Sequence, residues 1–276
     1  MDLWFTEKQT NTLGLSLKVL RTLVTEHTQF QDLAVLETEQ YGRMLVLDGI
    51  IQTTTADEFV YHEMITHVAL FTHKDPKTVA IIGGGDGGAV REVVKHPGVE
   101  RVVLVEIDER VVAASRQYLP EIAAGLSDER VEVRFEDGIR HIRENKGVYD
   151  VVIVDSTDPI GAAVGLFSAE FYADIYESLK DDGIMVAQTE SPFHNQDLIR
   201  KSFSAIRDLF PITRLYLAYV PTYPSGMWSF TIASKENDPL SVPMDRFINI
   251  PTKYYTPQIH FAAFTLPQFV GQMLQG

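Results

Sequence analysis

Five short apolar runs in the middle of the chain constrain its fold more than any other feature. A segment with helix-like spacing follows each run. Buried strands that alternate with helices form a parallel sheet covered on both faces. The sequence therefore predicts an α/β fold with a doubly wound sheet. The runs are VAIIG (79–83), RVVLVEI (101–107), VEVRF (131–135), VVIVD (151–155) and IMVAQ (184–188).

The regions before and after these runs have different patterns. Residues 1–60 contain short β-rich runs divided by turns, which predicts a small N-terminal β domain. Residues 61–276 would then form the larger domain that carries the sheet. Two later runs, at 213–220 and 228–234, are joined by the Pro/Gly-rich segment PTYPSGM. That joint favours an antiparallel hairpin, which would close the sheet.

A glycine-rich loop, IIGGGDGGAV (81–90), follows the first of the five runs. Gly83, Gly85 and Gly88 fit the pattern G-x-G-x-x-G between a strand and a helix. Glu106 ends the next strand, where an acid can bind the hydroxyls of a ribose. This pattern predicts a nucleotide or nucleoside site, and nucleoside-binding folds that lack a pyrophosphate site share it.

The acidic residue inside this loop, Asp86, distinguishes between these ligands. A carboxylate about 4 Å from a phosphate, at an effective dielectric constant of about 20, is opposed by roughly 4 kcal/mol. A cation would gain from the same carboxylate. The loop therefore predicts a nucleoside with a positively charged arm, such as a sulfonium or an amine. The alternative is that Asp86 faces solvent or caps the following helix.

Further acidic residues end or follow the predicted strands at one edge of the sheet. Ligands of open α/β sheets bind outside the carboxyl ends of the strands, so these acids should converge. Each of them has an ordinary alternative as a helix cap or turn residue. The residues are Glu106, Asp108, Asp137, Asp155 and Asp158.

The composition narrows the class of protein. The formal net charge is −14 and no run of Lys or Arg occurs, which argues against nucleic acid or an anionic membrane as a partner. The absence of cysteine excludes disulfides, thiolate nucleophiles and Cys-ligated metals. No apolar run approaches the roughly 20 residues of a membrane span, and the N-terminus lacks the pattern of a signal peptide. We expect a cytoplasmic protein.

Seven motifs together resemble the polyamine aminopropyltransferase family. The resemblance implies a Rossmann-like, methyltransferase-type catalytic domain over residues 61–276. It implies transfer of an aminopropyl group from decarboxylated S-adenosylmethionine to putrescine, giving spermidine and 5′-methylthioadenosine. It also implies a homodimer or homotetramer without a cofactor or metal. The motifs are LDGIIQTTTADEFVYHEM (47–64), GGGDGG (83–88), LVEID (104–108), EDG (136–138), DSTDPIG (155–161), PTYPSG (221–226) and KYYTPQIHFAAFTLPQF (253–269).

The resemblance assigns the reacting groups to four residues. Asp155 matches the base that accepts a proton from the attacking amine. Asp158 matches an acid that binds the acceptor amine. Tyr223 matches a tyrosine that helps to orient the attacking nitrogen, and Tyr61 matches a position that lines the substrate pocket. We expect both tyrosines to orient the nitrogen by hydrogen bonds.

The remaining carried-over residues bind the donor or line the pocket. Asp86 matches the acid that holds the ammonium of the aminopropyl arm, and Glu106 matches the acid that binds the ribose. Asp137 and Gly138 match the pair beside the adenine, and Gln31 matches a glutamine near the nucleoside.

Three further positions complete the predicted site. Gln52 and His62 match residues that line the substrate pocket. Many relatives have proline where this chain has Ala162, and that proline contacts the nucleoside. The alanine should leave that wall of the site less rigid.

Several alternatives remain open at this stage. The segment from His62 to His67 resembles a zinc-protease motif, but its histidines are five residues apart and do not share a helix face. A polyamine methyltransferase, an NAD-dependent oxidoreductase and a non-catalytic nucleoside-binding protein are other readings. Within the family, agmatine, cadaverine, 1,3-diaminopropane and spermidine are alternative acceptors.

Overall fold

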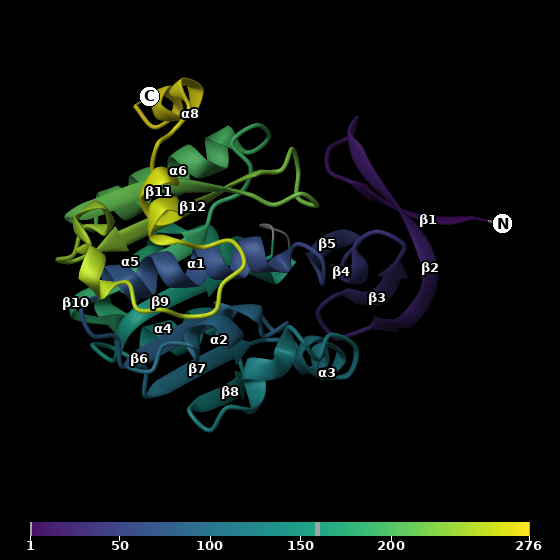
Figure 1. Cartoon of the computed structure of the whole chain (residues 1–276), viewed down its shortest axis with the longest axis horizontal. Helices are drawn as coiled ribbons and strands as arrows, with labels where there is room; N and C mark the ends of the chain where they lie inside the picture. The colour runs from purple at the N-terminus through teal and green to yellow at the C-terminus, as the bar shows by residue number, and fades with distance from the viewer. Residues whose placement is uncertain (1, 158–160, 276) are drawn as a thin grey trace.

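The computed structural model describes residues 2–157 and 161–275, and their strands form two sheets. The first sheet is an antiparallel meander in the order β1-β2-β3-β4-β5. It lies at one side of the larger unit, with β3 and β4 packed against α3 (Glu109–Tyr118) (Figure 1). Its strands are β1 (Leu3–Lys8), β2 (Gly14–His27), β3 (Asp32–Thr38), β4 (Gly42–Leu47) and β5 (Ile50–Thr54).

The second sheet has the order β11-β12-β10-β9-β6-β7-β8. The five predicted runs form its parallel part, and the predicted hairpin β11–β12 pairs antiparallel to β10 at one edge. The predicted α/β fold class is therefore confirmed. The strands are β6 (Thr78–Gly83), β7 (Arg101–Glu106), β8 (Val131–Phe135), β9 (Tyr149–Asp155), β10 (Leu179–Gln188), β11 (Ile212–Tyr219) and β12 (Met227–Ser234).

Helices cover both faces of this sheet, as a doubly wound fold requires. Helices α1 and α2 pack on one face, and α4, α5 and α6 pack on the other. No helix in the described part of the chain is long and apolar enough to cross a membrane. The helices are α1 (Glu58–Thr72), α2 (Gly88–Val93), α3 (Glu109–Tyr118), α4 (Gly138–Glu144), α5 (Ala169–Ser178), α6 (Gln196–Arg207), α7 (Pro257–Ala262) and α8 (Gln268–Met273).

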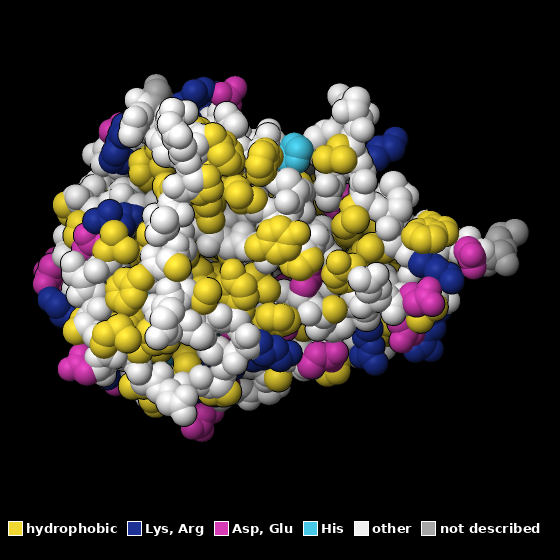
Figure 2. Space-filling view, turned by 45° about the horizontal axis from the view of Figure 1, so that its top comes forward, with side chains coloured by type: hydrophobic (Ala, Val, Ile, Leu, Met, Phe, Trp, Pro, Cys, Tyr) yellow, Lys and Arg dark blue, Asp and Glu magenta, His cyan; other side chains and the backbone are white. Residues whose placement is uncertain are grey.

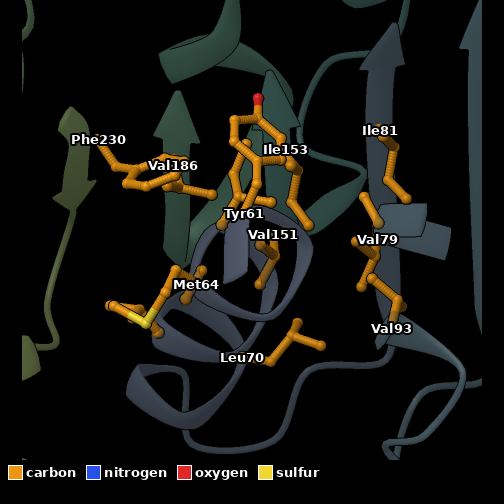
Figure 3. Close-up of a cluster of buried hydrophobic side chains, with 14 of the residues drawn as sticks. Tyr61, Met64, Leu70, Val79, Ile81, Val93, Val151, Ile153, Val186 and Phe230 are labelled. Atoms are coloured by element: carbon orange, nitrogen blue, oxygen red, sulfur yellow. The ribbon is translucent and has the colours of Figure 1, made fainter. Parts of the chain in front are cut away.

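Alternating strand residues divide the apolar core into two layers. In β9, Val151 and Ile153 pack toward α1, whereas Val152 and Val154 pack toward α5. This alternation follows from the two-residue period of a strand. Figure 3 shows the layer around α1, in which the hydroxyl of Tyr61 points out of the apolar cluster toward the carboxyl ends of the strands.

Helix α1 is buried on nearly all sides, which is unusual for a helix that contains His and Glu. A helix that is buried all round is normally apolar throughout. The polar side chains of α1 therefore need partners inside the protein. Glu63 is 1% exposed and accepts hydrogen bonds from the backbone N–H groups of Lys253, Tyr254 and Tyr255, at 2.7, 2.8 and 2.7 Å. One carboxylate thus anchors the C-terminal segment to the core.

Replacement of Glu63 by Gln should lower the free energy of unfolding by about 2–4 kcal/mol, because an amide cannot satisfy three buried N–H donors as a carboxylate does. Denaturant unfolding monitored by circular dichroism measures the change. Glu170→Gln is the control, since this side chain is 78% exposed and should change stability by about 0.5 kcal/mol or less. Equal stabilities of the two variants would show that Glu63 does not anchor the segment.

Candidate active site

A cavity of about 170 Å³ lies at the carboxyl ends of the parallel strands. It is centred where the strand order reverses, because β6 pairs with both β7 and β9 and the next strands run outward from this point. Ligands of doubly wound sheets bind at this switch point. Residues of β4 and β5 in the N-terminal sheet complete the wall. Figure 2 shows that hydrophobic side chains gather over the middle of one face, with most visible charged side chains toward its rim.

The structure brings ten of the twelve predicted site residues to this cavity. Asp158 lies outside the described residues, and the side chain of Ala162 is likewise outside them, although its backbone belongs to the 3₁₀ helix Gly161–Phe167. The ten are Gln31, Gln52, Tyr61, His62, Asp86, Glu106, Asp137, Gly138, Asp155 and Tyr223.

The glycine loop runs close against the end of β9. Gly83 and Gly84 have φ values of 80° and 68°, which residues with side chains rarely adopt. A Cβ atom on Gly83 would lie 2.2 Å from the Asp155 carbonyl oxygen, and one on Gly84 would lie 2.6 Å from Asp155 Oδ2. Glycine at these positions lets the loop approach the carboxylate of Asp155.

Asp155 ends β9 and lines the cavity. Its Oδ1 accepts a hydrogen bond from the Tyr61 hydroxyl at 2.7 Å, whereas its buried Oδ2 has no hydrogen-bond partner among the described residues. Burial, followed by repulsion from Asp86, raises the pKa of Asp155 to about 6, although His62 and Tyr61 act in the opposite direction. Asp155 therefore has one buried oxygen without a hydrogen bond and a pKa close to neutrality.

Asp86 is 9% exposed and faces the same cavity. Its Oδ1 accepts from the backbone N–H of Gly88 at 2.7 Å, and its Oδ2 lies 3.4 Å from His62 Nε2. Burial opposes ionisation of this carboxyl, but His62 and the Gly88 N–H outweigh it and hold the pKa of Asp86 below its ordinary value. Asp86 therefore does not face solvent, and the capping position of α2 is Gly87, so neither part of the alternative interpretation holds. Asp86 bonds to the first N–H of α2 and presents a charge to the cavity.

Glu106 ends β7 and lies under the glycine loop. It accepts hydrogen bonds from the backbone N–H groups of Gly85 at 3.2 Å and Asp108 at 3.0 Å. Burial raises the pKa of Glu106 to about 7, and these two donors oppose the rise. Hydroxyl groups of a ligand would add donors to Glu106 and favour its charged form.

Asp137 and Gly138 form another wall of the cavity, at the start of α4. Asp137 caps the helix, because its Oδ1 accepts from the backbone N–H groups of Ile139 and Arg140. A Cβ atom on Gly138 would lie 2.4 Å from a side-chain carbon of Ile82. Glycine therefore lets this backbone lie against β6, beside the cavity.

The N-terminal sheet is tied to the site through Asp108, which sequence reasoning noted as a strand-end acid but did not place in the site. Its Oδ2 accepts from Gln31 Nε2 at 3.0 Å and from the Thr28 hydroxyl at 2.7 Å. Asp108 also caps α3 through Arg110 N–H. The carboxylate thus fixes the orientation of Gln31 in the cavity wall.

Tyr223 reaches the site from the β11–β12 hairpin. Its hydroxyl donates to the Gln52 carbonyl oxygen at 2.6 Å. Asp57, just before α1, accepts from both the N–H and the hydroxyl of Thr222, at 3.0 and 2.7 Å. These bonds hold the hairpin loop over the ends of the strands, and Asp57 is a positioning residue that the sequence did not reveal.

A second, smaller cavity of about 30 Å³ shares part of this wall, including Gln52, Tyr61 and Tyr223. Sequence reasoning missed five polar or aromatic residues that line it: Glu7 from β1, Ser156 and Thr157 after β9, Gln188 from β10 and Trp228 from β12. Gln188 ends a parallel strand, so the strand-end rule could have found it. Glu7 lies far away in sequence, and no motif marks it.

Two clusters of His and acidic residues were considered as metal ligands. His67 bonds to Glu92 and His96, so it does not share a site with His62. His73, Asp150 and Asp182 place ligand atoms within 4.8 Å of one another. However, the Nδ1 atom of His73 accepts a backbone N–H bond from Asp75, which places the proton of a neutral ring on Nε2. That nitrogen, which faces Asp182, therefore has no lone pair for a cation.

Comparison with known proteins identifies the family. The chain matches the spermine/spermidine synthase domain over residues 58–242 and the spermidine synthase tetramerisation domain over residues 3–55. The polyamine aminopropyltransferase of Caldicellulosiruptor bescii is 59% identical over 275 residues, covering 100% of this chain and 99% of the relative. That of Moorella thermoacetica is 60% identical over 273 residues, covering 99% and 96%.

Solved structures agree with this assignment. A spermidine synthase in complex with the transition-state analogue AdoDATO is similar with a TM-score of 0.95 and 43% identity, covering 99% of this chain and 95% of that one. Spermidine synthase from Thermotoga maritima has a TM-score of 0.94 and 42% identity, with 99% and 94% covered. The chain belongs to the spermine/spermidine synthase family and is a polyamine aminopropyltransferase, as the resemblance of its motifs predicted.

Replacement of Tyr61 by Phe should raise the pKa of Asp155 above about 6, because it removes the hydrogen bond that favours the charged carboxylate. Carboxyl ¹³C NMR of Asp-labelled protein follows the titration, and the Asp155→Asn spectrum identifies the signal. A midpoint that stays the same or falls in Tyr61→Phe would contradict the geometry described for this pair.

Proposed function

We propose that this aminopropyltransferase is a spermidine synthase. It transfers the aminopropyl group of decarboxylated S-adenosylmethionine to putrescine and forms spermidine and 5′-methylthioadenosine. The observation that supports the proposal most is the pair of buried acids in one cavity: Asp86 in the glycine loop, with a lowered pKa, and Asp155, with a raised one. Acids whose environments push their pKa values apart are suited to different roles.

The donor is bound along the ends of β6, β7 and β8. Glu106 accepts hydrogen bonds from the ribose, and Asp137, Gly138 and Gln31 surround the rest of the nucleoside. Asp86 attracts the ammonium of the aminopropyl arm. Ordinary S-adenosylmethionine carries a carboxylate on that arm, which Asp86 would repel, so the residue selects the decarboxylated donor.

The acceptor must lose a proton before it reacts. An alkylamine has a pKa of about 10.4, so a neutral amine near pH 7.5 costs about 3 pKa units, or roughly 4 kcal/mol. The free Oδ2 of Asp155 accepts this proton. The nitrogen then attacks the aminopropyl carbon, the carbon–sulfur bond breaks, and its electron pair returns to sulfur as the neutral thioether. The sulfonium is already a good leaving group, so no metal or cofactor is required.

The other groups orient the amine. Tyr61 and Tyr223 lie with ring centroids 5.6 Å apart at the boundary of the two cavities. They direct the nitrogen toward the donor, and Asp158 holds the acceptor amine. In-line alignment by these groups supplies much of the rate enhancement.

The small size of the second cavity is an argument for a short acceptor amine. Its volume of about 30 Å³ suits little more than a group the size of ammonium or water. A diamine with four carbons would place its distal ammonium there, near Glu7. A longer acceptor would have to displace the residues that line this cavity.

The N-terminal sheet carries the match to a tetramerisation domain, and we propose that it joins copies of the chain into a homodimer or homotetramer.

The reaction is tested by incubating the purified protein with decarboxylated S-adenosylmethionine and an equimolar mixture of putrescine, cadaverine, agmatine and spermidine. A parallel reaction contains ordinary S-adenosylmethionine. Mass spectrometry should find spermidine and methylthioadenosine in the first reaction only. A different aminopropyl product would keep the mechanism and change the acceptor. Methylated amine with S-adenosylhomocysteine in the second reaction would overturn the proposal in favour of a methyltransferase.

The value of kcat/KM for the amine should fall about tenfold for each pH unit below about pH 6, because protonated Asp155 cannot accept a proton. Asp155→Asn should lose at least about 100-fold in kcat and should no longer show this limb. Steady-state rates from pH 5 to pH 9 provide the measurement. Near-normal turnover in Asp155→Asn with an unchanged pH profile would remove Asp155 from the role of base.

A further inference from the structure

A largely buried ion pair between Glu58 and Arg91 lies next to His62, the residue that contacts Asp86 of the glycine loop. Glu58, the first residue of α1, is 5% exposed, and its two oxygens accept from Arg91 Nη1 at 2.9 Å and Nη2 at 2.8 Å. Such a bidentate contact fixes the positions of both side chains. Arg91 comes from α2, so the pair joins the two helices that begin beside the cavity. Neither residue lines the main cavity.

His62 connects this ion pair to Asp86. Its Nδ1 lies 2.6 Å from Glu58 Oε2, and its Nε2 lies 3.4 Å from Asp86 Oδ2. Ionised carboxylates only accept hydrogen bonds, so each ring nitrogen must carry a proton to interact favourably. The two carboxylates, one on each side of the ring, together favour the imidazolium form. Burial alone would favour the neutral ring, but Asp86 and Glu58 raise the pKa of His62 well above its ordinary value.

The start of α2 is shaped to seat this ring. A Cβ atom on Gly88 would lie 2.2 Å from His62 Cε1 and from its Nδ1. The last glycine of the G-x-G-x-x-G pattern is therefore required by a histidine of another helix. The Tyr61 ring packs edge-on against His62 at 5.4 Å, and Asp155 lies beyond its hydroxyl. These contacts leave the ring little freedom to turn.

We propose that Glu58 and Arg91 are positioning residues of the aminopropyl site, which hold His62 against Asp86 and thereby fix the carboxylate that receives the ammonium of the donor. The inference rests on the function proposed above. It assigns to His62 a role that differs from simple contact with substrate, because both of its nitrogens are engaged by carboxylates.

The positive charge on His62 also affects the protonation of Asp155, the proposed base. Asp86 and Asp155 are both buried and repel each other, which favours a proton on one of them. The positive ring of His62 reduces this repulsion, so both acids can be ionised together. The charged groups around His62 are Glu58 on α1, Asp86 in the loop, Arg91 on α2 and Asp155 on β9. Loss of the positive ring should therefore make Asp155 keep its proton to higher pH.

The test is Glu58→Gln, which keeps an acceptor for His62 Nδ1 but removes the charge. The first readout is ¹⁵N NMR of His-labelled protein, with His62→Gln to identify the signal. In the unmodified protein His62 should stay an imidazolium from pH 6 to pH 8, and in Glu58→Gln it should become neutral within that range. This readout does not depend on activity, so it distinguishes failure of the inference from failure of the proposed reaction.

The second readout is kinetic. In Glu58→Gln the acid limb of kcat/KM should move to higher pH by about one unit, and KM for the donor should rise more than kcat falls. Arg91→Lys keeps the charge but loses the two-pronged contact, so it should raise KM for the donor while His62 stays an imidazolium. Asp238→Asn is the matched control, since Asp238 forms a two-pronged pair with Arg214 away from both cavities. It should change neither readout.

Either of two results would overturn the inference. One is a neutral His62 in the unmodified protein at pH 7, which can be observed even if Glu58→Gln and Arg91→Lys fail to fold, because it needs only the His62→Gln spectrum for assignment. The other is a folded Glu58→Gln protein whose His62 signal and acid limb match those of the unmodified protein.

Discussion

The structure depends on how it accommodates negative charge inside a cavity at the carboxyl edge of a parallel sheet. Asp86, Glu106 and Asp155 are largely removed from water there. A buried charge is costly unless a partner compensates for it. His62 lies beside Asp86 and offsets its charge, and backbone N–H groups donate hydrogen bonds to Glu106. One oxygen of Asp155 has no such partner among the residues described. This arrangement is the basis for proposing a ligand with positive charge.

Helix α1 supplies much of the polar network that surrounds these buried charges. It is buried on nearly every side, yet each of its acidic and histidine side chains has a defined partner. Glu58 pairs with Arg91, His62 with Asp86, Glu63 with the C-terminal segment, and His67 with Glu92. A helix of this kind specifies its neighbours more closely than an apolar helix would, because each polar group must meet its own partner. The same helix supplies Tyr61, whose hydroxyl donates to Asp155.

Much of the fold and site followed from the sequence for clear reasons. Apolar runs alternating with helical segments define a parallel sheet, and the rule that ligands bind at its carboxyl edge gathers Glu106, Asp137 and Asp155. The interpretation of Asp86 required only Coulomb's law. Gln31, Gln52 and Tyr223 come from distant segments and were assigned through the family resemblance. No local pattern could have placed them.

What the sequence did not reveal depends on contacts between distant segments. Three contacts bring together residues that are more than 30 positions apart in the sequence. Glu58 pairs with Arg91, Asp108 accepts a hydrogen bond from Gln31, and Glu7 lines the second cavity beside residues of later segments. Periodicity and strand-end rules say which face a residue occupies, but not which side chain it meets. Gly88 is an example. The sequence pattern assigned it to a nucleotide-binding motif, but in the structure the ring of His62 occupies the position that a side chain on residue 88 would take.

The central claim is that the acid in the glycine loop selects a nucleoside with a cationic arm. Isothermal titration calorimetry with decarboxylated and ordinary S-adenosylmethionine, on the unmodified protein and on Asp86→Asn, tests it most directly. The account predicts that the unmodified protein binds the decarboxylated compound at least about 100-fold more tightly, and that Asp86→Asn loses most of this preference. Equal affinities in the unmodified protein, or a preference that survives in Asp86→Asn, would contradict it.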